Sequence, residues 1–308
     1  MFYTFWFKEL LFFMMNMFND TITNRSVVPA IEVLLLKPCP VLNHGFVSVV
    51  DYMGDDEAIC QAARVSYGKG TRSVSDNRNL INYLMRHRHT SPFEMCVIKL
   101  HLKMPLFVAR QWVRHRMASI NEYSARYSVL DKEFYIPEEN VICTQSKNNK
   151  QGRGEQISSQ KAREVAQWLE NEAKQTYHTY ETLLGEEYNI ARELARINLP
   201  LSMYTQFYWK IDLHNLFHFL ALRCEGHAQY EIREYAHIIL GIVEKWVPLA
   251  FAAFKEYRLE AVTLSRTMVT VLQRMLVGED VQQENSGLTK REWEEFMEKF
   301  SSSRLCPQ

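Results

Sequence analysis

The chain has 308 residues, of which 47% are hydrophobic and 23% are charged. This composition is that of a globular protein and excludes a disordered or fibrous chain. Lys plus Arg and Asp plus Glu each number 36, so the formal net charge is zero. A protein that coats nucleic acid needs a clear basic excess, and we therefore expect no nucleic-acid partner.

Cysteine usage and the first segment bear on the cellular compartment. The six cysteines include no C-x-x-C pair, which argues against a zinc ribbon or a disulfide framework and favours a reducing, cytoplasmic environment. Residues 1–18 are apolar but are interrupted by Lys8, Glu9 and Asn16, so no run reaches the roughly 18 residues of a membrane span. We expect residues 1–40 to be an N-terminal extension and assign it no function. An interfacial helix and a start codon assigned too early remain open for it.

Beyond this extension, the hydrophobic pattern predicts a mixture of strands and helices. The segment over residues 41–54 predicts a first strand that ends at Gly54, and a helix is expected to begin at Asp55 or Asp56. A second helical pattern covers residues 76–88. Residues 96–104 alternate apolar and polar side chains, which indicates a strand with one solvated face.

Pro105 is expected to open the next helix, because a first helical turn accepts proline. That helix would place Arg110 and Arg114 one turn apart on the same face. Residues 144–160 are almost entirely polar or glycine, which indicates a flexible surface insertion. A long amphipathic helix is expected after it.

For the helices in the last third of the chain, capping residues predict where each helix begins. Asp212 is a predicted N-cap for a helix over 213–223, and a further helix is expected over about 227–245. Thr289 and Glu292 form a capping-box pattern for a last short helix.

These elements predict a helix-rich α+β fold with a small antiparallel sheet. Since no composition shift marks a boundary, we expect a single domain over residues 41–260, with the insertion at 144–160 inside it. The tail at 261–308 is expected to be partly helical.

The densest chemistry lies in residues 110–126, which read RQWVRHRMASINEYSAR. The planar guanidinium of arginine suits phosphates and ring edges, while Asn, Glu and Ser supply further donors and acceptors. This mixture favours a site for a nucleotide. A solvated, charged helix face is the alternative, but Glu122 is the only acidic residue in the segment that could pair with its four arginines.

An R-H-R-x7-S pattern runs from Arg114 to Ser124 and resembles the signature of flavin-dependent thymidylate synthases. The similarity to this family covers about Val41 to Tyr257, and the remaining residues look peculiar to this protein. Four longer segments resemble the family in the same order, namely residues 45–68, 86–94, 105–128 and 195–232.

The resemblance implies a subunit of a homotetramer whose active sites form where subunits meet. It implies methylation of dUMP to dTMP, with 5,10-methylenetetrahydrofolate as carbon donor and FAD carrying hydride from NADPH. The alternative is a non-catalytic nucleotide- or RNA-binding module that uses residues 110–126 as a phosphate clamp. No membrane partner is expected.

The resemblance also implies the site residues, position by position. The implied catalytic residues are Arg223, which would act on the uracil N3, together with Ser124 and His89. The implied dUMP-binding residues are Gln111, Trp112, Val113, Arg114, Glu122, Tyr123, Ser124, Ala125, Arg126, Arg196 and Arg223. The implied FAD-binding residues are Ser91, Arg114, His115, Arg116, Glu122, Asp212, Leu213, His214 and His218. Asp212 and His218 stand where many members of the family carry asparagine, and Met95 stands where many carry histidine.

Two residues near these positions could be mistaken for nucleophiles. Cys224 adjoins Arg223, but neighbours on a helix point about 100° apart, so we expect Cys224 to face the core. No histidine–acid pair lies close to Ser124 in sequence to deprotonate it, and we expect a hydrogen-bond donor there. Activation of the uracil ring is then expected from flavin hydride and arginine charge.

Other candidates are given structural or flavin-binding roles. His214 and His218 have a zinc-ligand spacing, but no third ligand is evident, so we expect flavin contacts and no metal. The aromatic residues Tyr204, Phe207, Tyr208 and Trp209 are expected in the core. Since no G-x-G-x-x-G motif occurs, FAD is expected to be held by Arg, His and helix N-termini.

Overall fold

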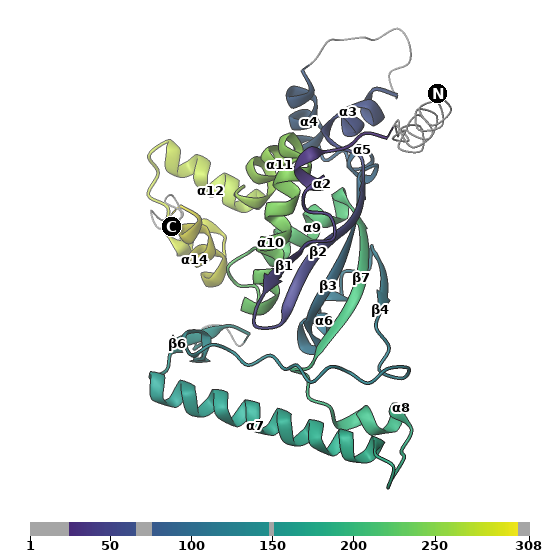
Figure 1. The fold of residues 1–308 in the computed structure, drawn as a ribbon. Helices are drawn as coiled ribbons and strands as arrows, with labels where there is room; N and C mark the ends of the chain where they lie inside the picture. Colours follow the sequence, from purple (N-terminus) through teal and green to yellow (C-terminus); the bar gives the residue numbers. More distant parts are fainter. Residues whose placement is uncertain (1–24, 66–75, 148–150, 301–308) are drawn as a thin grey trace, which may run out of the picture. The chain divides into compact units, whose positions relative to one another are not determined.

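The computed structural model describes residues 25–65, 76–147 and 151–300 (Figure 1). The chain divides into two compact units, residues 1–252 and 253–308. The boundary between the units lies close to residue 260, where we expected the tail to begin.

The first unit contains a five-stranded antiparallel sheet within its described residues (Figure 1). Side chains of β3 alternate as predicted: Ile98, Leu100 and Leu102 are fully buried, while Lys99 and His101 are only partly so. In spatial order the strands are β1 (Pro38–Val41), β2 (Gly45–Met53), β3 (Val97–Pro105), β7 (Tyr204–Asp212) and β4 (Ser119–Glu122).

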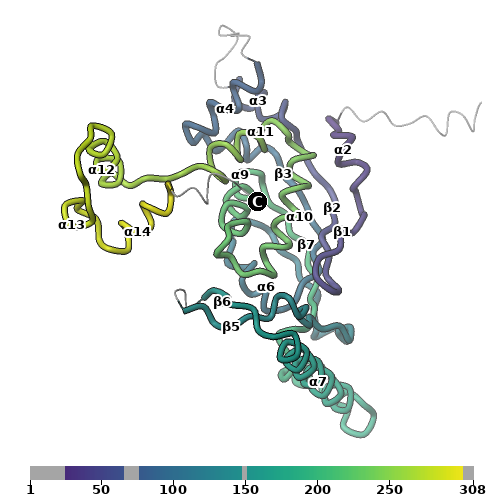
Figure 2. Tube along the Cα trace, turned by 90° about the vertical axis from the view of Figure 1, so that its left-hand side faces the viewer, coloured from purple at the N-terminus to yellow at the C-terminus, as the bar shows by residue number. Residues whose placement is uncertain are grey.

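Three helices cover the apolar face of this sheet (Figure 2). They are α6 (Leu106–Trp112), α9 (Leu213–Arg223) and α10 (Tyr230–Trp246). The ring of Trp112 on α6 lies 5.1 Å from Trp209 on β7 and 4.5 Å from Phe219 on α9. It also lies 6.2 Å from Tyr235 on α10. One aromatic cluster therefore fixes the three helices to the sheet.

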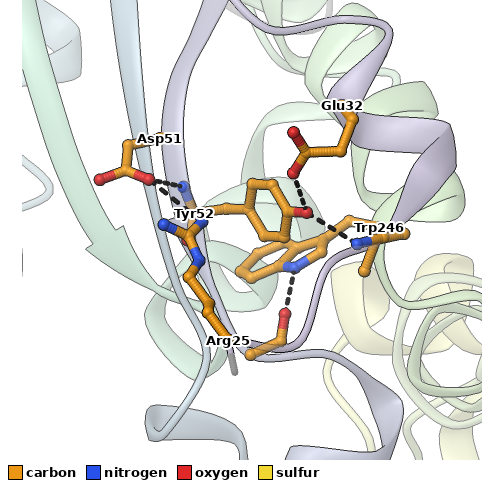
Figure 3. Close-up of polar contacts among 7 residues, drawn as sticks. Arg25, Glu32, Asp51, Tyr52 and Trp246 are labelled. Atoms are coloured by element: carbon orange, nitrogen blue, oxygen red, sulfur yellow. Dashed lines mark hydrogen bonds and ion pairs between the residues drawn. The ribbon is translucent and has the colours of Figure 1, made fainter. Parts of the chain in front are cut away.

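Residues 25–40, part of the expected N-terminal extension, pack against the sheet. β1 pairs with β2, and Ile31 of α2 (Pro29–Glu32) is fully buried. The Tyr52 hydroxyl accepts a 2.7 Å hydrogen bond from the Val28 amide and donates to Glu32 (Figure 3). The same network includes Arg25, Asp51 and Trp246.

The helix that Pro105 introduces is shorter than expected. α6 ends at Trp112 with Val113 as its C-cap, so the prediction that Arg110 and Arg114 share a helix face is wrong. The chain turns after Val113 because residues 119–122 add to the sheet as the edge strand β4, paired with β7.

Residues 144–160 contain regular structure that the polar composition concealed. β5 (Cys143–Gln145) and β6 (Arg153–Gln156) pair as an antiparallel hairpin. An ion pair from Arg153 to Glu231 attaches the hairpin to α10. Glu231 is 2% exposed and also accepts a 3.0 Å hydrogen bond from the Tyr135 hydroxyl.

A second apolar cluster lies under the long helix α7 (Ser159–Leu184). It joins Tyr177 and Tyr180 of α7 to Leu130 and to Ala195 of α8 (Arg192–Ala195). The Tyr177 hydroxyl donates a 2.7 Å hydrogen bond to the Leu130 carbonyl. This cluster holds the chain that follows β4 against α8.

Most of the predicted helices are confirmed, and their caps explain why. α3 (Asp56–Val65) begins after Asp55, whose carboxylate accepts from the Ala58 amide at 2.8 Å. Asp212 caps α9 by accepting from the Asn215 amide at 2.9 Å. α4 (Asn77–Arg86) and α10 also match their predicted ranges to within a few residues. The short helix α5 (Ser91–Glu94) packs against α9.

The second unit has its own apolar cluster, which includes Val271 and Phe296. Its helices are α12 (Arg266–Leu276), α13 (Gln283–Ser286) and α14 (Lys290–Lys299). Thr289 and Glu292 form the predicted capping box of α14. These helices lie within the segment that we expected to be partly helical.

The aromatic residues of β7 show the alternation of a strand. Tyr204, Phe207 and Trp209 are buried as predicted, but Tyr208 is 45% exposed. The expectation for Tyr208 is wrong because successive side chains of a strand point to opposite faces. Among the described helices, none is long and apolar enough to cross a bilayer.

Candidate active site

Two cavities gather nine of the nineteen predicted site residues. The first, which we term the β4 cavity, has a volume of about 510 Å³ and lies where β4 gives way to the following loop. Its lining includes Glu122, Tyr123, Ser124, Ala125 and Arg196, five of the predicted dUMP-binding residues. The structure thus brings together two segments that are more than seventy positions apart in sequence.

Polar side chains in and around the β4 cavity are held by hydrogen bonds and an ion pair. Oε1 of Glu122 accepts a 2.7 Å hydrogen bond from the hydroxyl of Thr205, which is 4% exposed. Arg126 forms a 3.4 Å ion pair with Glu193, which also lines the cavity. The Ser124 hydroxyl accepts a 3.3 Å hydrogen bond from the Arg126 amide. The cavity therefore offers both cationic and anionic groups.

The second cavity, which we term the α9 cavity, has a volume of about 230 Å³. Its lining includes Arg114, His115, Arg116 and His218, four of the predicted FAD-binding residues. Asn215 also lines it, while its side chain donates to the capping carboxylate of Asp212 at 2.7 Å.

His115 and Arg223 form a direct contact. The Nε–H of Arg223 donates to Nε2 of His115 at 2.9 Å. Burial, with smaller contributions from Arg223 and His218, lowers the pKa of His115 from 6.5 to about 4. His115 is therefore neutral near pH 7, and because Nε2 accepts, its proton lies on Nδ1. Burial also lowers the pKa of Arg223.

Gln111 carries a feature that fits a ligand. Its Oε1 atom is buried and has no hydrogen-bond partner among the described residues. Buried polar atoms in folded proteins are almost always paired. An N–H or O–H group of a bound molecule would satisfy this oxygen.

Two predicted binding residues cannot offer their side chains to a ligand. Trp112 and Leu213 are both 0% exposed. Trp112 packs in the aromatic cluster between α6 and the sheet. If either position contacts a ligand, it would do so through its backbone groups. A motif can predict which stretch of chain lies near a site. Which of its side chains are buried depends on the packing of the helix that carries them.

Several other predicted residues lie outside the lining of both cavities. His89 and Ser91 are exposed, and Ser91 begins α5. Asp212 serves as the cap of α9. The remaining residues of this kind are Gln111, Val113, Arg126, His214 and Arg223, although Arg223 reaches the α9 cavity through His115.

Cys224 is half-buried at the C-cap of α9, so the expectation of a core position is only partly met. Burial raises the pKa of its thiol to about 12. The thiol is therefore protonated near neutral pH and a poor nucleophile. The described residues contain no group of three or more His, Cys, Asp or Glu side chains placed to hold a metal ion.

Sequence reasoning missed three polar residues that line the cavities, namely Thr205, Glu193 and Asn215. Glu193 precedes Arg196 by three positions, a spacing that places two residues on one helical face and could have drawn attention to it. No comparable signal marks Thr205, because its role depends on the pairing of β4 with β7.

Known proteins share both the sequence and the fold. Residues 48–249 match the family model described as thymidylate synthase complementing protein. The flavin-dependent thymidylate synthase of Gluconobacter oxydans is 61% identical over 276 residues, covering 89% of this chain and 91% of that protein. The corresponding protein of Ruegeria pomeroyi is 58% identical over 278 residues, covering 90% and 92%.

A solved structure agrees with these relatives. The crystal structure of the UMP/dUMP methylase PolB from Streptomyces cacaoi, bound with 5-Br UMP, has a TM-score of 0.64. The two chains are 32% identical, with 71% of this chain and 97% of PolB covered. The fold is thus that of a pyrimidine nucleotide methylase. The chain belongs to the flavin-dependent thymidylate synthase family, the enzymes that methylate dUMP to dTMP.

This result confirms the resemblance drawn from the R-H-R-x7-S pattern, and the alternative of a non-catalytic binding module is wrong. It also corrects the expected extent of the similarity. An alignment of 276 residues does not fit within residues 41–257. Part of the segments that looked peculiar to this protein is therefore shared with relatives.

Proposed function

We propose that the chain joins the methylene group of 5,10-methylenetetrahydrofolate to dUMP and uses FAD to carry hydride from NADPH. The observation that carries this proposal is that one short stretch of chain lines both cavities. Arg114, His115 and Arg116 line the α9 cavity, and Glu122 and Ser124 line the β4 cavity. A nucleotide and a redox cofactor bound there would be held by adjacent residues.

The β4 cavity fits dUMP in size and in polarity. Its volume of about 510 Å³ lies within the range of roughly 300–1,000 Å³ typical of small-molecule sites. Arg196 supplies a cation for the phosphate, while Glu122 accepts from donors of the sugar or the base.

The α9 cavity fits part of a flavin dinucleotide. Arg114 and Arg116 suit a diphosphate, and His115 and His218 offer ring nitrogens to the rest of the cofactor. A volume of about 230 Å³ is too small to enclose a whole dinucleotide. This mismatch supports the proposal of a homotetramer in which a neighbouring subunit completes the site. When bound, FAD would supply the hydride chemistry that no protein side chain provides.

Arg223 is the residue we assign to the uracil ring. Arginine stays protonated at any working pH, so it stabilises an anionic ring and does not take up a proton. The hydrogen bond to neutral His115 uses one of the five N–H donors of Arg223 and fixes the orientation of its planar group.

A spectroscopic assay tests the proposal. We expect the purified protein to be yellow, to be bleached by NADPH and to recover its colour in air. Addition of dUMP and 5,10-methylenetetrahydrofolate to the reduced protein should yield dTMP, and sedimentation should give four copies of the chain. A colourless protein that binds no FAD, or a coloured monomer that forms dTMP, would contradict the proposal.

A further inference from the structure

We propose that Thr205 is a positioning residue that holds the Glu122 carboxylate in place to receive a donor group of the nucleotide. The inference rests on the proposed function, because it takes the β4 cavity as the nucleotide site. Its test nevertheless separates the two. Thr205 lies outside the R-H-R-x7-S segment, on a different strand from Glu122.

The sheet register brings the two side chains together. Glu122 is the last residue of β4 and stands opposite Phe207 on β7, so Thr205 is its diagonal neighbour on the same face. The Thr205 hydroxyl donates to Oε1 of Glu122 at 2.7 Å. Since β7 lies between β3 and β4, Thr205 is 4% exposed and has a fixed backbone.

The two partners differ in mobility, and this difference gives the contact its effect. Glu122 lies on an edge strand and is exposed, so without Thr205 its carboxylate could adopt several rotamers. Ordering such a side chain on binding weakens the affinity for a ligand. A hydrogen bond from the sheet interior orders it beforehand.

The contact also determines which ligand group Glu122 can receive. An ionised carboxylate only accepts hydrogen bonds, and Oε1 is engaged by Thr205, which leaves Oε2 for the ligand. A sugar hydroxyl or a ring N–H fits this acceptor, whereas a phosphate would be repelled. The nucleotide would therefore direct its phosphate to Arg196 and a donor-bearing part to Glu122.

The test uses Thr205→Val, which removes the hydroxyl and keeps a β-branched side chain, and Thr205→Ser, which keeps the hydroxyl. Binding of dUMP to the purified holoenzyme is measured by calorimetry, together with KM and kcat. We expect Thr205→Val to weaken dUMP binding about ten-fold, mainly in KM, and Thr205→Ser to stay within about three-fold of the wild type.

A matched control and a double-mutant cycle distinguish positioning from general stabilisation. Ser48 is another buried hydroxyl of the same sheet, 6% exposed and outside the lining of the β4 cavity. Ser48→Ala should leave dUMP binding unchanged. In a Glu122→Ala background, which removes the acceptor of the Thr205 hydroxyl, Thr205→Val should alter dUMP binding less than about two-fold, because Thr205 acts through Glu122.

Each outcome decides the inference. Unchanged dUMP binding in Thr205→Val, or a loss in the Glu122→Ala background as large as in the wild type, would overturn it and leave the proposed function intact. A wild-type protein that fails to bind dUMP would overturn the proposed function and the inference together. If Thr205→Val does not fold, Thr205→Ala takes its place in the same cycle.

Discussion

The β4 cavity and the α9 cavity share one stretch of chain but differ in charge. In the β4 cavity, Glu122 and Glu193 face Arg196, so both signs are present. The described residues that line the α9 cavity include Arg114 and Arg116 and no carboxylate. The first therefore suits a ligand with an anionic end and a donor-bearing end, and the second suits a purely anionic group such as a diphosphate.

The comparison also separates two kinds of positioning. In the β4 cavity a buried hydroxyl orients an acidic side chain. Beside the α9 cavity a neutral histidine orients an arginine. If this distinction is correct, a substitution at the β4 cavity should weaken dUMP binding, whereas a substitution at Arg223 should slow dTMP formation.

The largest expected effect follows loss of Arg223. Charged hydrogen bonds contribute about 1.5–3 kcal/mol, so Arg223→Ala should slow dTMP formation roughly ten- to a hundred-fold. Arg223→Lys should recover little, because it lacks the planar, two-pronged group. The measurement compares dTMP formation with flavin reduction by NADPH in the absence of dUMP, which should barely change. If flavin reduction were impaired as much as methylation, Arg223 could not be assigned to the uracil ring.

Ser124 should give a smaller effect, confined to the β4 cavity. Ser124→Ala removes one neutral hydrogen-bonding group, worth about 0.5–1.5 kcal/mol, so KM for dUMP should rise about ten-fold or less. Turnover should remain measurable, because no nucleophile is lost. Steady-state kinetics check this, and complete inactivity of a folded Ser124→Ala protein would show that the hydroxyl does more than bind.

His115 should make stability depend on pH. The unfolded chain takes up this proton near pH 6.5 and the folded chain only near pH 4. Between these values the unfolded state holds more protons, so the contribution of His115 to the free energy of unfolding falls as the pH drops. Denaturant titrations at several pH values should show a shallower decline for His115→Gln, which has no titrating ring. An identical decline in both proteins would refute the shifted pKa.

The smallest effect is expected at Cys224. With a thiol pKa of about 12, the residue offers no thiolate near neutral pH. Cys224→Ala should therefore form dTMP at a rate within about two-fold of the wild type. A variant that folds and binds FAD but forms no dTMP would require a thiolate mechanism.

Local signals in the sequence were sufficient for much of the fold. The caps at Asp212 and Thr289 and the alternation in β3 depend on neighbouring residues, and each is present in the structure. Strand β4 could not be predicted in this way, because all four of its residues are exposed and show no alternation. Its existence depends on the pairing with β7.

The candidate site likewise contains residues that a local motif predicts and residues that it does not. The R-H-R-x7-S pattern predicted residues that line both cavities. Their partners come from distant segments, as Thr205 is 83 positions from Glu122 and Arg223 is 108 positions from His115. Sequence spacing carries no information on such contacts, because the sheet register and the packing of α9 create them.

The strand β1 has a consequence for the behaviour of a shortened chain. β1 occupies one edge of the sheet and covers the backbone groups of β2. A chain that began at residue 41 would leave the nine-residue strand β2 as the new edge, with unpaired N–H and C=O groups beside the buried Val47 and Val49. Uncovered edges of this kind pair with other molecules. Aggregation of such a chain would then reflect the loss of an edge strand and not the loss of a catalytic residue.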